Sequence, residues 1–281
     1  MNAIVIYHKG CLDGFTAAWC FYDYFRDKPQ HNIEYHAGVY QDPPPDVRGK
    51  YVFLVDFSYK RPVVEEMIKV AESVILIDHH KTALEDLDGL PGLGMANSSI
   101  QNSGCVLAWT FLNNGMRPPA ALQLIEDRDL WKFSMFRTKA FNTYLFTQPQ
   151  TFDRWTELMY SRTDQIAEYV DIGNIIIAAR DKDINSIIKS TRRTMVIADM
   201  AVPVVNAPFM YASDIGAVLS PNEHFVAIYY DAGDHRNFNL RSDKDYIGAW
   251  DVSEIAKLYG GGGHKHAAGF KVSRDHELAR I

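Results

Sequence analysis

The sequence predicts an α/β protein with an N-terminal parallel sheet, a linker helix and a smaller C-terminal α/β domain. Three short apolar runs lie between residues 3 and 77 and are separated by stretches with helical spacing. Continuous apolar runs of this kind are typical of parallel strands that helices cover on both faces. The chain has 281 residues, more than one hydrophobic core usually needs, so two domains are expected.

The first half predicts a succession of strands and helices. The expected strands are residues 3–7, 51–55 and 73–77, the expected helices are 14–24 and 62–71, and a helical segment follows at 104–133. Within that segment Pro118 and Pro119 open a second helix. Right-handed crossovers place the carboxyl ends of the strands along one edge of the sheet, where ligands bind in such folds.

The second half predicts a connector and a further sheet. Residues 164–190 form a long helical stretch with few turn signals. Strands are expected at 195–198, 202–206, 225–230, 238–240 and 267–272, with a helix at 251–259. We therefore expect a first domain over residues 1–160, a linker helix over 161–192 and a second domain over 193–281.

Composition narrows the function. Hydrophobic residues make up 47% of the chain and charged residues 23%, as in an ordinary folded protein. The net charge of −6 argues against wrapping long nucleic acids, because that mode needs many Lys and Arg side chains. A short or mononucleotide-sized phosphate substrate remains compatible, since a bound metal supplies positive charge locally.

The sequence also predicts the compartment. Cys11, Cys20 and Cys105 form neither a CxxC pair nor a disulfide-like framework, which suits a reducing environment. The N-terminus lacks the basic and apolar regions of a signal peptide, and no apolar run has the roughly 18 residues of a membrane span. The cytoplasm is therefore expected, without membrane association.

Acidic and histidine side chains follow each of the three apolar strands. His8 and Asp13 come after the first, Asp56 directly after the second, and Asp78-His79-His80 directly after the third. A single aspartate at such a place is more simply explained as a helix N-cap. Three successive strand ends would instead converge at one sheet edge. Carboxylates mixed with imidazole suit Mn²⁺ or a similar ion better than Ca²⁺, and a cation relieves their repulsion.

A fourth candidate is the segment from Glu126 to Trp131. Asp127 and Asp129 either pair with neighbouring basic residues at a solvated helix end, or one of them is the last metal ligand. Beside the three strand-end groups, either Asp127 or Asp129 becomes a candidate for the last metal ligand.

A glycine-rich segment near the C-terminus is the second strong signal. Gly260 to Gly263 are four consecutive glycines, followed by His264. Such a run suits a backbone that approaches a ligand closely or offers N–H groups to an anion; the alternative is a flexible hairpin loop. Arg241 could add a phosphate clamp, or could simply end an exposed strand. The residues expected to contact substrate are Arg241, Ser242, Gly261, Gly262, Gly263 and His264.

Taken together, these motifs resemble the DHH phosphoesterase superfamily. Asp78-His79-His80 after an apolar strand, Asp56 upstream and the segment Gly261 to Phe270 occur in the expected order. The C-terminal part is similar to the DHHA1 domain of that superfamily. The resemblance spans nearly the whole chain and points to the branch that degrades oligonucleotides.

The resemblance implies a metal-dependent phosphodiesterase that releases mononucleotides from short single-stranded oligonucleotides. One or two Mn²⁺ ions are implied, with Mg²⁺ or Co²⁺ as alternatives. The implied metal ligands are His8, Asp13, Asp56, His79 and Asp127, with Asp129 as the alternative to Asp127. Asp78 and His80 are the implied catalytic residues, with His80 facing the scissile phosphate. The oligomeric state is left open, with a homodimer among the options.

One position departs from the family pattern. The first motif usually carries two aspartates as Asp-x-Asp, whereas this chain has Cys11-Leu12-Asp13. Cys11 either ligates as a thiolate or lies beside the metal as a small apolar group, so the number of ions stays open. The alternative functions are a cyclic mono- or dinucleotide phosphodiesterase and, from another class, an inactive nucleotide-binding sensor.

Overall fold

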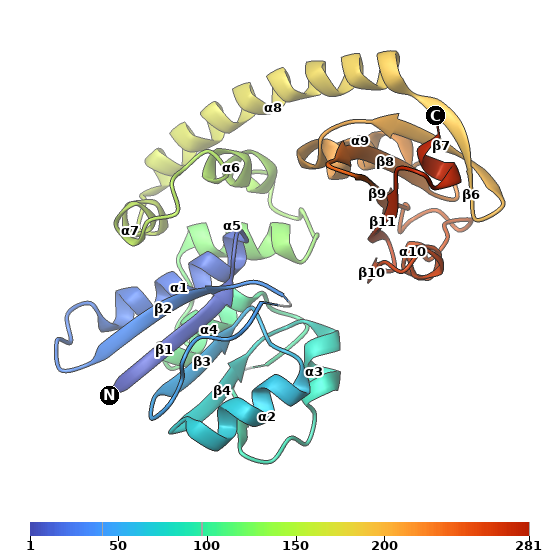
Figure 1. Cartoon of the computed structure of the whole chain (residues 1–281). Coiled ribbons are helices and arrows are strands. Elements are labelled where there is room, and N and C mark those ends of the chain that lie inside the picture. Colours follow the sequence, from blue (N-terminus) through green and yellow to red (C-terminus); the bar gives the residue numbers. More distant parts are fainter. Residues whose placement is uncertain (41, 97, 281) are drawn as a thin grey trace. The chain divides into compact units, whose positions relative to one another are not determined.

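The computed structural model describes residues 1–40, 42–96 and 98–280, which form two compact units (Figure 1). The first unit is Met1–Ile177 and the second is Ala178–Ile281. They divide within α8 (Thr163–Thr191), a helix of 29 residues and thus about 44 Å long. The division falls inside the segment expected to connect two domains. None of the described helices is both long and apolar enough to cross a membrane.

The first unit is built on a parallel sheet, as the sequence predicts. In the described part of the chain it has five strands in the order β2-β1-β3-β4-β5, and every neighbouring pair is parallel. The strands are β1 (Asn2–His8), β2 (Asn32–Gly38), β3 (Tyr51–Val55), β4 (Ser73–Ile77) and β5 (Leu93–Met95). The order reverses between β1 and β3, and ligands bind at such a switch point in open α/β sheets.

Helices cover both faces of this sheet. They are α1 (Leu12–Phe25), α2 (Arg61–Val70), α3 (Lys81–Leu87), α4 (Gly104–Leu112), α5 (Ala120–Asp129), α6 (Thr138–Leu145) and α7 (Phe152–Met159). On one face α1 packs along α4, with α5 and α7 beside them. On the other face a second apolar cluster joins the sheet to α2 and α3.

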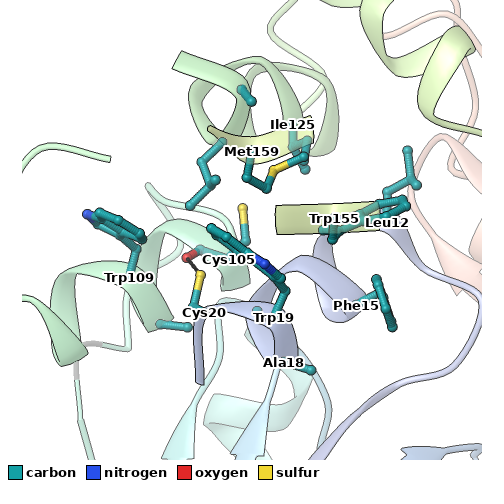
Figure 2. Close-up of a cluster of buried hydrophobic side chains, with 14 of the residues drawn as sticks. Leu12, Phe15, Ala18, Trp19, Cys20, Cys105, Trp109, Ile125, Trp155 and Met159 are labelled. Atoms are coloured by element: carbon teal, nitrogen blue, oxygen red, sulfur yellow. Dashed lines mark hydrogen bonds between the residues drawn. The ribbon is translucent and has the colours of Figure 1, made fainter. Parts of the chain in front are cut away.

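Two buried tryptophans fix α1 in the larger cluster (Figure 2). The indole of Trp19 donates a hydrogen bond to Thr156 at 3.0 Å, and that of Trp155 donates to Thr16 at 2.9 Å. Both indoles are fully buried, and truncating a buried aromatic to Ala costs about 3–5 kcal/mol. These bonds join α1 to α7 within the apolar cluster that covers this face of the sheet.

The second unit has its own mixed sheet. Over the described ranges it contains six strands in the order β10-β11-β9-β8-β7-β6, of which only β7 and β8 pair in parallel. The strands are β6 (Arg193–Ile197), β7 (Met200–Asn206), β8 (Val226–Ala232), β9 (His235–Arg241), β10 (Gly262–His264) and β11 (Ala267–Ser273). Helix α10 (Val252–Leu258) packs on one face and α9 (Ala212–Leu219) on the other.

Candidate metal centre

Strand register brings the predicted strand-end residues together. Tyr7 of β1 pairs with Val55 of β3, which in turn pairs with Ile77 of β4. Because the strands are parallel, the next residue on each, His8, Asp56 and Asp78, stands at the same level of the sheet edge. The expected convergence is therefore what the structure shows. It lies across the β1/β3 switch point.

Asp56 adopts an uncommon backbone conformation at the end of β3. Its φ is 50°, in the left-handed region that aspartate enters more readily than most side chains. Its N–H donates to the carbonyl of Ile77 at 3.0 Å, so the neighbouring strand fixes this turn. Strained residues of this kind concentrate at functional sites. Here the turn places a fully buried carboxylate at the sheet edge.

His79 lies among three carboxylates. Its Nε2 is 3.1 Å from Asp56 Oδ1, 3.4 Å from Asp129 Oδ2 and 4.0 Å from Asp13 Oδ2. These residues come from the ends of β3 and β4, the start of α1 and the end of α5. Four elements thus supply one compact group of nitrogen and oxygen donors.

Asp78 orients the two histidines that follow it. Its Oδ1 accepts hydrogen bonds from the N–H groups of His79 at 2.7 Å and His80 at 3.1 Å, and lies 2.7 Å from His80 Nδ1. Burial lowers the pKa of His80, but the hydrogen bond and negative charge of Asp78 outweigh it, and the net pKa is raised. The buried carboxylate of Asp78 therefore orients His80 and favours the charged form of its imidazole.

The donor set fits a divalent cation. Asp13, Asp56 and Asp78 are buried, and Oδ2 of each finds no hydrogen-bond partner among the described residues. A buried acceptor left unpaired costs about 1–3 kcal/mol, so three at one place call for a positive ligand. Candidate donor atoms lie within 4.8 Å of one another in these groups: Asp56, Asp78, His79 and His80; His8, Cys11 and Asp56; Asp13, His79 and Asp129.

Repulsion between the carboxylates appears in their pKa values. Burial, and next the charge of Asp13, raise the pKa of Asp56 well above its ordinary value. The same two causes raise the pKa of Asp129 to about 7. Burial, with Asp56 close by, also raises the pKa of the Cys11 thiol well above its usual range. Without a cation this cluster favours protonated groups, and a cation reverses that preference.

Two glycines allow the helices to approach the carboxylates. A Cβ on Gly104, the first residue of α4, would lie 2.5 Å from the Cβ of Asp56 and 2.9 Å from Oδ2 of Asp13. A Cβ on Gly14 would lie 3.0 Å from Oδ2 of Asp56. The next amide of α4, on Cys105, donates to Asp13 Oδ1 at 3.1 Å. The bare backbone at Gly104 therefore belongs to the site, although the sequence offered no sign of it.

The two aspartates at the end of α5, Asp127 and Asp129, have different partners in the structure. Asp127 Oδ1 accepts from the N–H and hydroxyl of Ser134, at 2.9 and 2.6 Å, and Oδ2 accepts from the N–H of Met135 at 3.0 Å and the hydroxyl of Thr138 at 2.5 Å. Burial opposes ionisation of Asp127, but these bonds prevail and lower its pKa to about 2. Asp127 organises the following loop, whereas Asp129 belongs to one of the candidate metal-binding groups.

Tyr40 lies beside His8 at the candidate metal centre, and it is not among the site residues predicted from the sequence. Its ring centroid is 5.1 Å from that of His8 and 5.0 Å from that of Phe57. Burial, followed by the charges of Asp78 and Asp56, raises its pKa to about 12, so the phenol keeps its proton. Tyr40 follows β2, a strand that the sequence did not predict, and no local pattern marked it.

The remaining predicted contacts lie in the second unit. Arg241 of β9 stands opposite Ala267 of β11, which stands opposite His264 of β10. Directly opposed residues share a face, so Arg241 and His264 flank a small residue on one face of the sheet. No described carboxylate pairs with Arg241, whose guanidinium donates to the Leu240 carbonyl and the Ser213 hydroxyl. Burial lowers the pKa of Arg241.

The glycine run has a structural role as well. A Cβ on Gly261 would lie 2.1 Å from the carbonyl oxygen of Gly269, and one on Gly263 would lie 2.6 Å from that of Ala267. Close packing of the β10–β11 hairpin thus requires both glycines, whereas Gly262 faces open space. Ser242 is buried, and its hydroxyl donates to the Trp250 carbonyl.

Comparisons with known proteins agree with this architecture. An uncharacterised protein of Acanthamoeba polyphaga mimivirus is 30% identical over 96% of this chain and 67% of its own length. The oligoribonuclease NrnB of Bacillus subtilis is 29% identical over 80% of this chain and 60% of its own. The chain thus spans about two thirds of the length of these relatives. No protein-family model matches it.

Solved structures share the fold. A pGpG-specific phosphodiesterase, PggH from Vibrio cholerae, has a TM-score of 0.57 at 11% identity and covers 97% of this chain and 94% of that one. The DHH domain of a member of the s1p family of ribosomal proteins has a TM-score of 0.56 at 11% identity, covering 95% and 82%. With the sequence relatives and the order of its motifs, the chain belongs to the DHH phosphoesterase superfamily.

Proposed function

We propose that this protein hydrolyses the phosphodiester bonds of short single-stranded oligonucleotides and releases mononucleotides. The observation that carries the proposal is the set of three buried, unpaired carboxylate oxygens around His79 at the switch point of the sheet. The relative NrnB, described as an oligoribonuclease, favours oligonucleotides as the substrate class.

His8, Asp13, Asp56, His79 and Asp129 would hold the metal. Asp56 and His79 each belong to two of the candidate donor groups, which suits two ions that share ligands. When bound, the ions supply Lewis-acid activation of water and neutralise charge on the phosphate. Mn²⁺ fits the mixture of imidazole and carboxylate, with Mg²⁺ and Co²⁺ as alternatives. The Cys11 thiol, near His8 and Asp56, would favour the softer ions.

His80 and Asp78 would act on the phosphate. Asp78 holds the imidazole through Nδ1 and favours its charged form. A protonated His80 would donate a hydrogen bond to a phosphoryl oxygen as negative charge grows there, which is the usual role of such a donor in the transition state. Tyr40, beside His8, would offer a second donor, which is the neutral hydroxyl of its phenol.

The second unit would bind the rest of the substrate. Arg241 presents a guanidinium without a described carboxylate partner, and His264 is exposed in the same cross-strand row. A guanidinium recognises a phosphate through paired, charge-assisted hydrogen bonds. A few contacts of this kind suit a short substrate and the acidic net charge of the chain.

The test is a cleavage assay with Mn²⁺ and end-labelled di-, tri- and longer oligonucleotides, with cyclic mono- and dinucleotides in parallel. Wild type is compared with the Asp78→Ala/His79→Ala variant and with Asp46→Ala, an exposed aspartate that pairs with Arg48. Stepwise release of mononucleotides, lost on chelation and in the double variant but kept in Asp46→Ala, is expected. Cleavage of cyclic nucleotides alone would redirect the function to those substrates. Nucleotide binding without cleavage would favour the sensor.

A further inference from the structure

The loop between α5 and α6, residues 130–137, exposes aromatic side chains next to the candidate metal centre. Trp131 is 49% exposed, Phe133 39% and Phe136 87%. Three large aromatic rings in the solvent within six residues are unusual for a connecting loop, which is ordinarily polar. Clustered apolar exposure of this kind marks a ligand or partner site.

The chain itself ties this loop to the metal centre. Trp131 follows Asp129 by two residues, so their Cα atoms are at most about 7 Å apart. Asp129 Oδ2 lies 3.4 Å from Nε2 of His79. The ammonium of Lys132 donates to the carbonyl of Gln101 at 3.4 Å, three residues before Gly104. The loop is thus joined to the carboxylate cluster through Asp129 and to the segment before α4 through Lys132, so the backbone of Trp131 lies close to the cluster.

The loop is held in a specific shape. Trp131 and Phe133 have φ values of 53° and 46°, an uncommon conformation for bulky residues. The carbonyl of Asp127 accepts from the N–H groups of Lys132 at 2.9 Å and Phe133 at 3.2 Å, in addition to the four bonds to its carboxylate. The two rings meet edge to face, 4.9 Å apart. Asp127 is thus a positioning residue that presents a preformed aromatic pair.

The charge around the loop suits a nucleic acid strand. Between residues 128 and 139 the sequence has Arg128, Lys132, Arg137 and Lys139 against the single acidic Asp129, in a chain of net charge −6. The guanidinium of Arg137 lies 5.4 Å from the ring of Phe136. Aromatic rings interleaved with basic side chains are the common means of binding single strands without reading their sequence.

We propose that Trp131, supported by Phe133, stacks on a nucleobase of the substrate whose phosphate lies at the metal centre. The proposal rests on the proposed function, and it names the group that this part of the site recognises. A base is one ribose away from its phosphate, so a phosphate near Asp129 and His79 brings a base close to Trp131. Stacking on one ring is tolerant of sequence because every base has a π face.

The test compares Trp131→Ala, Trp131→Phe and Phe133→Ala with wild type. Tyr24→Ala is the matched control, because Tyr24 is 38% exposed and lies 11 residues along α1 from Asp13, about 16 Å away. KM and kcat are measured with a dinucleotide and with the same dinucleotide lacking one base. Binding of a non-hydrolysable dinucleotide is measured separately by calorimetry in the presence of Mn²⁺.

Trp131→Ala is expected to raise KM roughly ten-fold or more for the normal dinucleotide, with a much smaller change in kcat. The same variant should not change KM for the baseless dinucleotide, and Trp131→Phe should restore most of the loss. If Trp131→Ala behaves like Tyr24→Ala while hydrolysis persists, the stacking proposal is wrong and the proposed function stands. If nothing is cleaved but base-dependent binding is lost in Trp131→Ala, stacking stands and the proposed function falls. Binding that never depends on the base overturns stacking.

Discussion

The two units differ in how their candidate functional side chains are buried and paired. In the first, carboxylates are buried at a sheet edge, and three of their oxygens have no partner in the described part of the chain. In the second, Arg241 and His264 stand in one row of a sheet, with His264 exposed to solvent. The first arrangement is unfavourable without a cation, whereas the second is stable alone. We therefore expect a cation at the candidate metal centre to stabilise the fold of the first unit, and expect the fold of the second unit to need no bound ligand.

Removing one shared ligand gives the largest expected effect. Asp56→Asn keeps the shape of the side chain but removes a charge and one acceptor. We expect Mn²⁺ affinity and oligonucleotide hydrolysis to fall about 100-fold or more, beyond the loss typical for groups that only support a ligand. Calorimetric Mn²⁺ titration and the cleavage assay measure both, with Asp46→Asn as the control. If the variant hydrolyses oligonucleotides near the wild-type rate, Asp56 is not a metal ligand.

The two aspartates of α5 provide a sharper comparison within the first unit. Asp129→Asn should weaken Mn²⁺ binding about ten-fold or more and leave folding intact. Asp127→Asn should leave Mn²⁺ affinity nearly unchanged and lower the free energy of unfolding by about 1–3 kcal/mol, because an amide cannot accept all four hydrogen bonds. Metal titrations and urea unfolding of both variants decide between these roles. If Asp127→Asn weakens Mn²⁺ binding and Asp129→Asn does not, Asp127 is the metal ligand.

A variant in the second unit tests whether the units act separately. Arg241→Ala should raise KM for a trinucleotide roughly ten-fold through loss of a charge-assisted hydrogen bond. Its kcat at saturation and its Mn²⁺ affinity should stay close to wild type. Arg274→Ala, which removes a surface pair with Asp231, is the control. A loss of Mn²⁺ affinity in Arg241→Ala would contradict the division of labour.

The pH dependence of stability gives the smallest expected effect. The pKa of Asp129 rises from 3.8 to about 7 in the folded chain. Between these values the folded state binds more protons than the unfolded state, so this stabilising contribution is complete below pH 3.8 and is lost as pH rises through 7.

In EDTA, the melting temperature should therefore decline from pH 6 to pH 8 by roughly a few degrees, and Mn²⁺ should stabilise more at pH 8. Differential scanning fluorimetry with and without Mn²⁺ measures this, and Asp129→Asn should flatten the EDTA curve. A wild-type curve that rises with pH would be inconsistent with the carboxylate repulsion described.

The sequence predicts that the strand-end residues of the first unit lie together, because parallel strand pairing aligns them. Asp56 and Asp78 each follow an uninterrupted apolar strand. Parallel pairing then brings the strand ends together, independently of the sequence of the connecting loops. β2 was missed because most of its residues are only partly buried. In the described sheet it lies at the edge beside β1, so it lacks the apolar run of a central strand. Tyr40, which depends on β2, was missed with it.

Other features depend on contacts that a sequence does not display. The donors that bind Asp127 lie seven to eleven residues further along the chain, so nothing local separates it from Asp129. The exposure of Trp131 and Phe133 follows from the same loop; among 15 Phe and 5 Trp residues, composition alone points to core packing. In the second unit, the glycine run suggested anion contact, whereas hairpin packing accounts for Gly261 and Gly263.

Gly104 sets a limit on how this centre can be copied. It brings no functional group, yet any other L-amino acid would place a carbon 2.5 Å from the Cβ of Asp56. A designer who transplanted only the ligands into another parallel sheet would therefore lose their spacing unless the first turn of a neighbouring helix were left bare. In a saturation library selected for activity, Gly104 should be as intolerant of replacement as the ligands, and its invariance would come from the space it leaves empty.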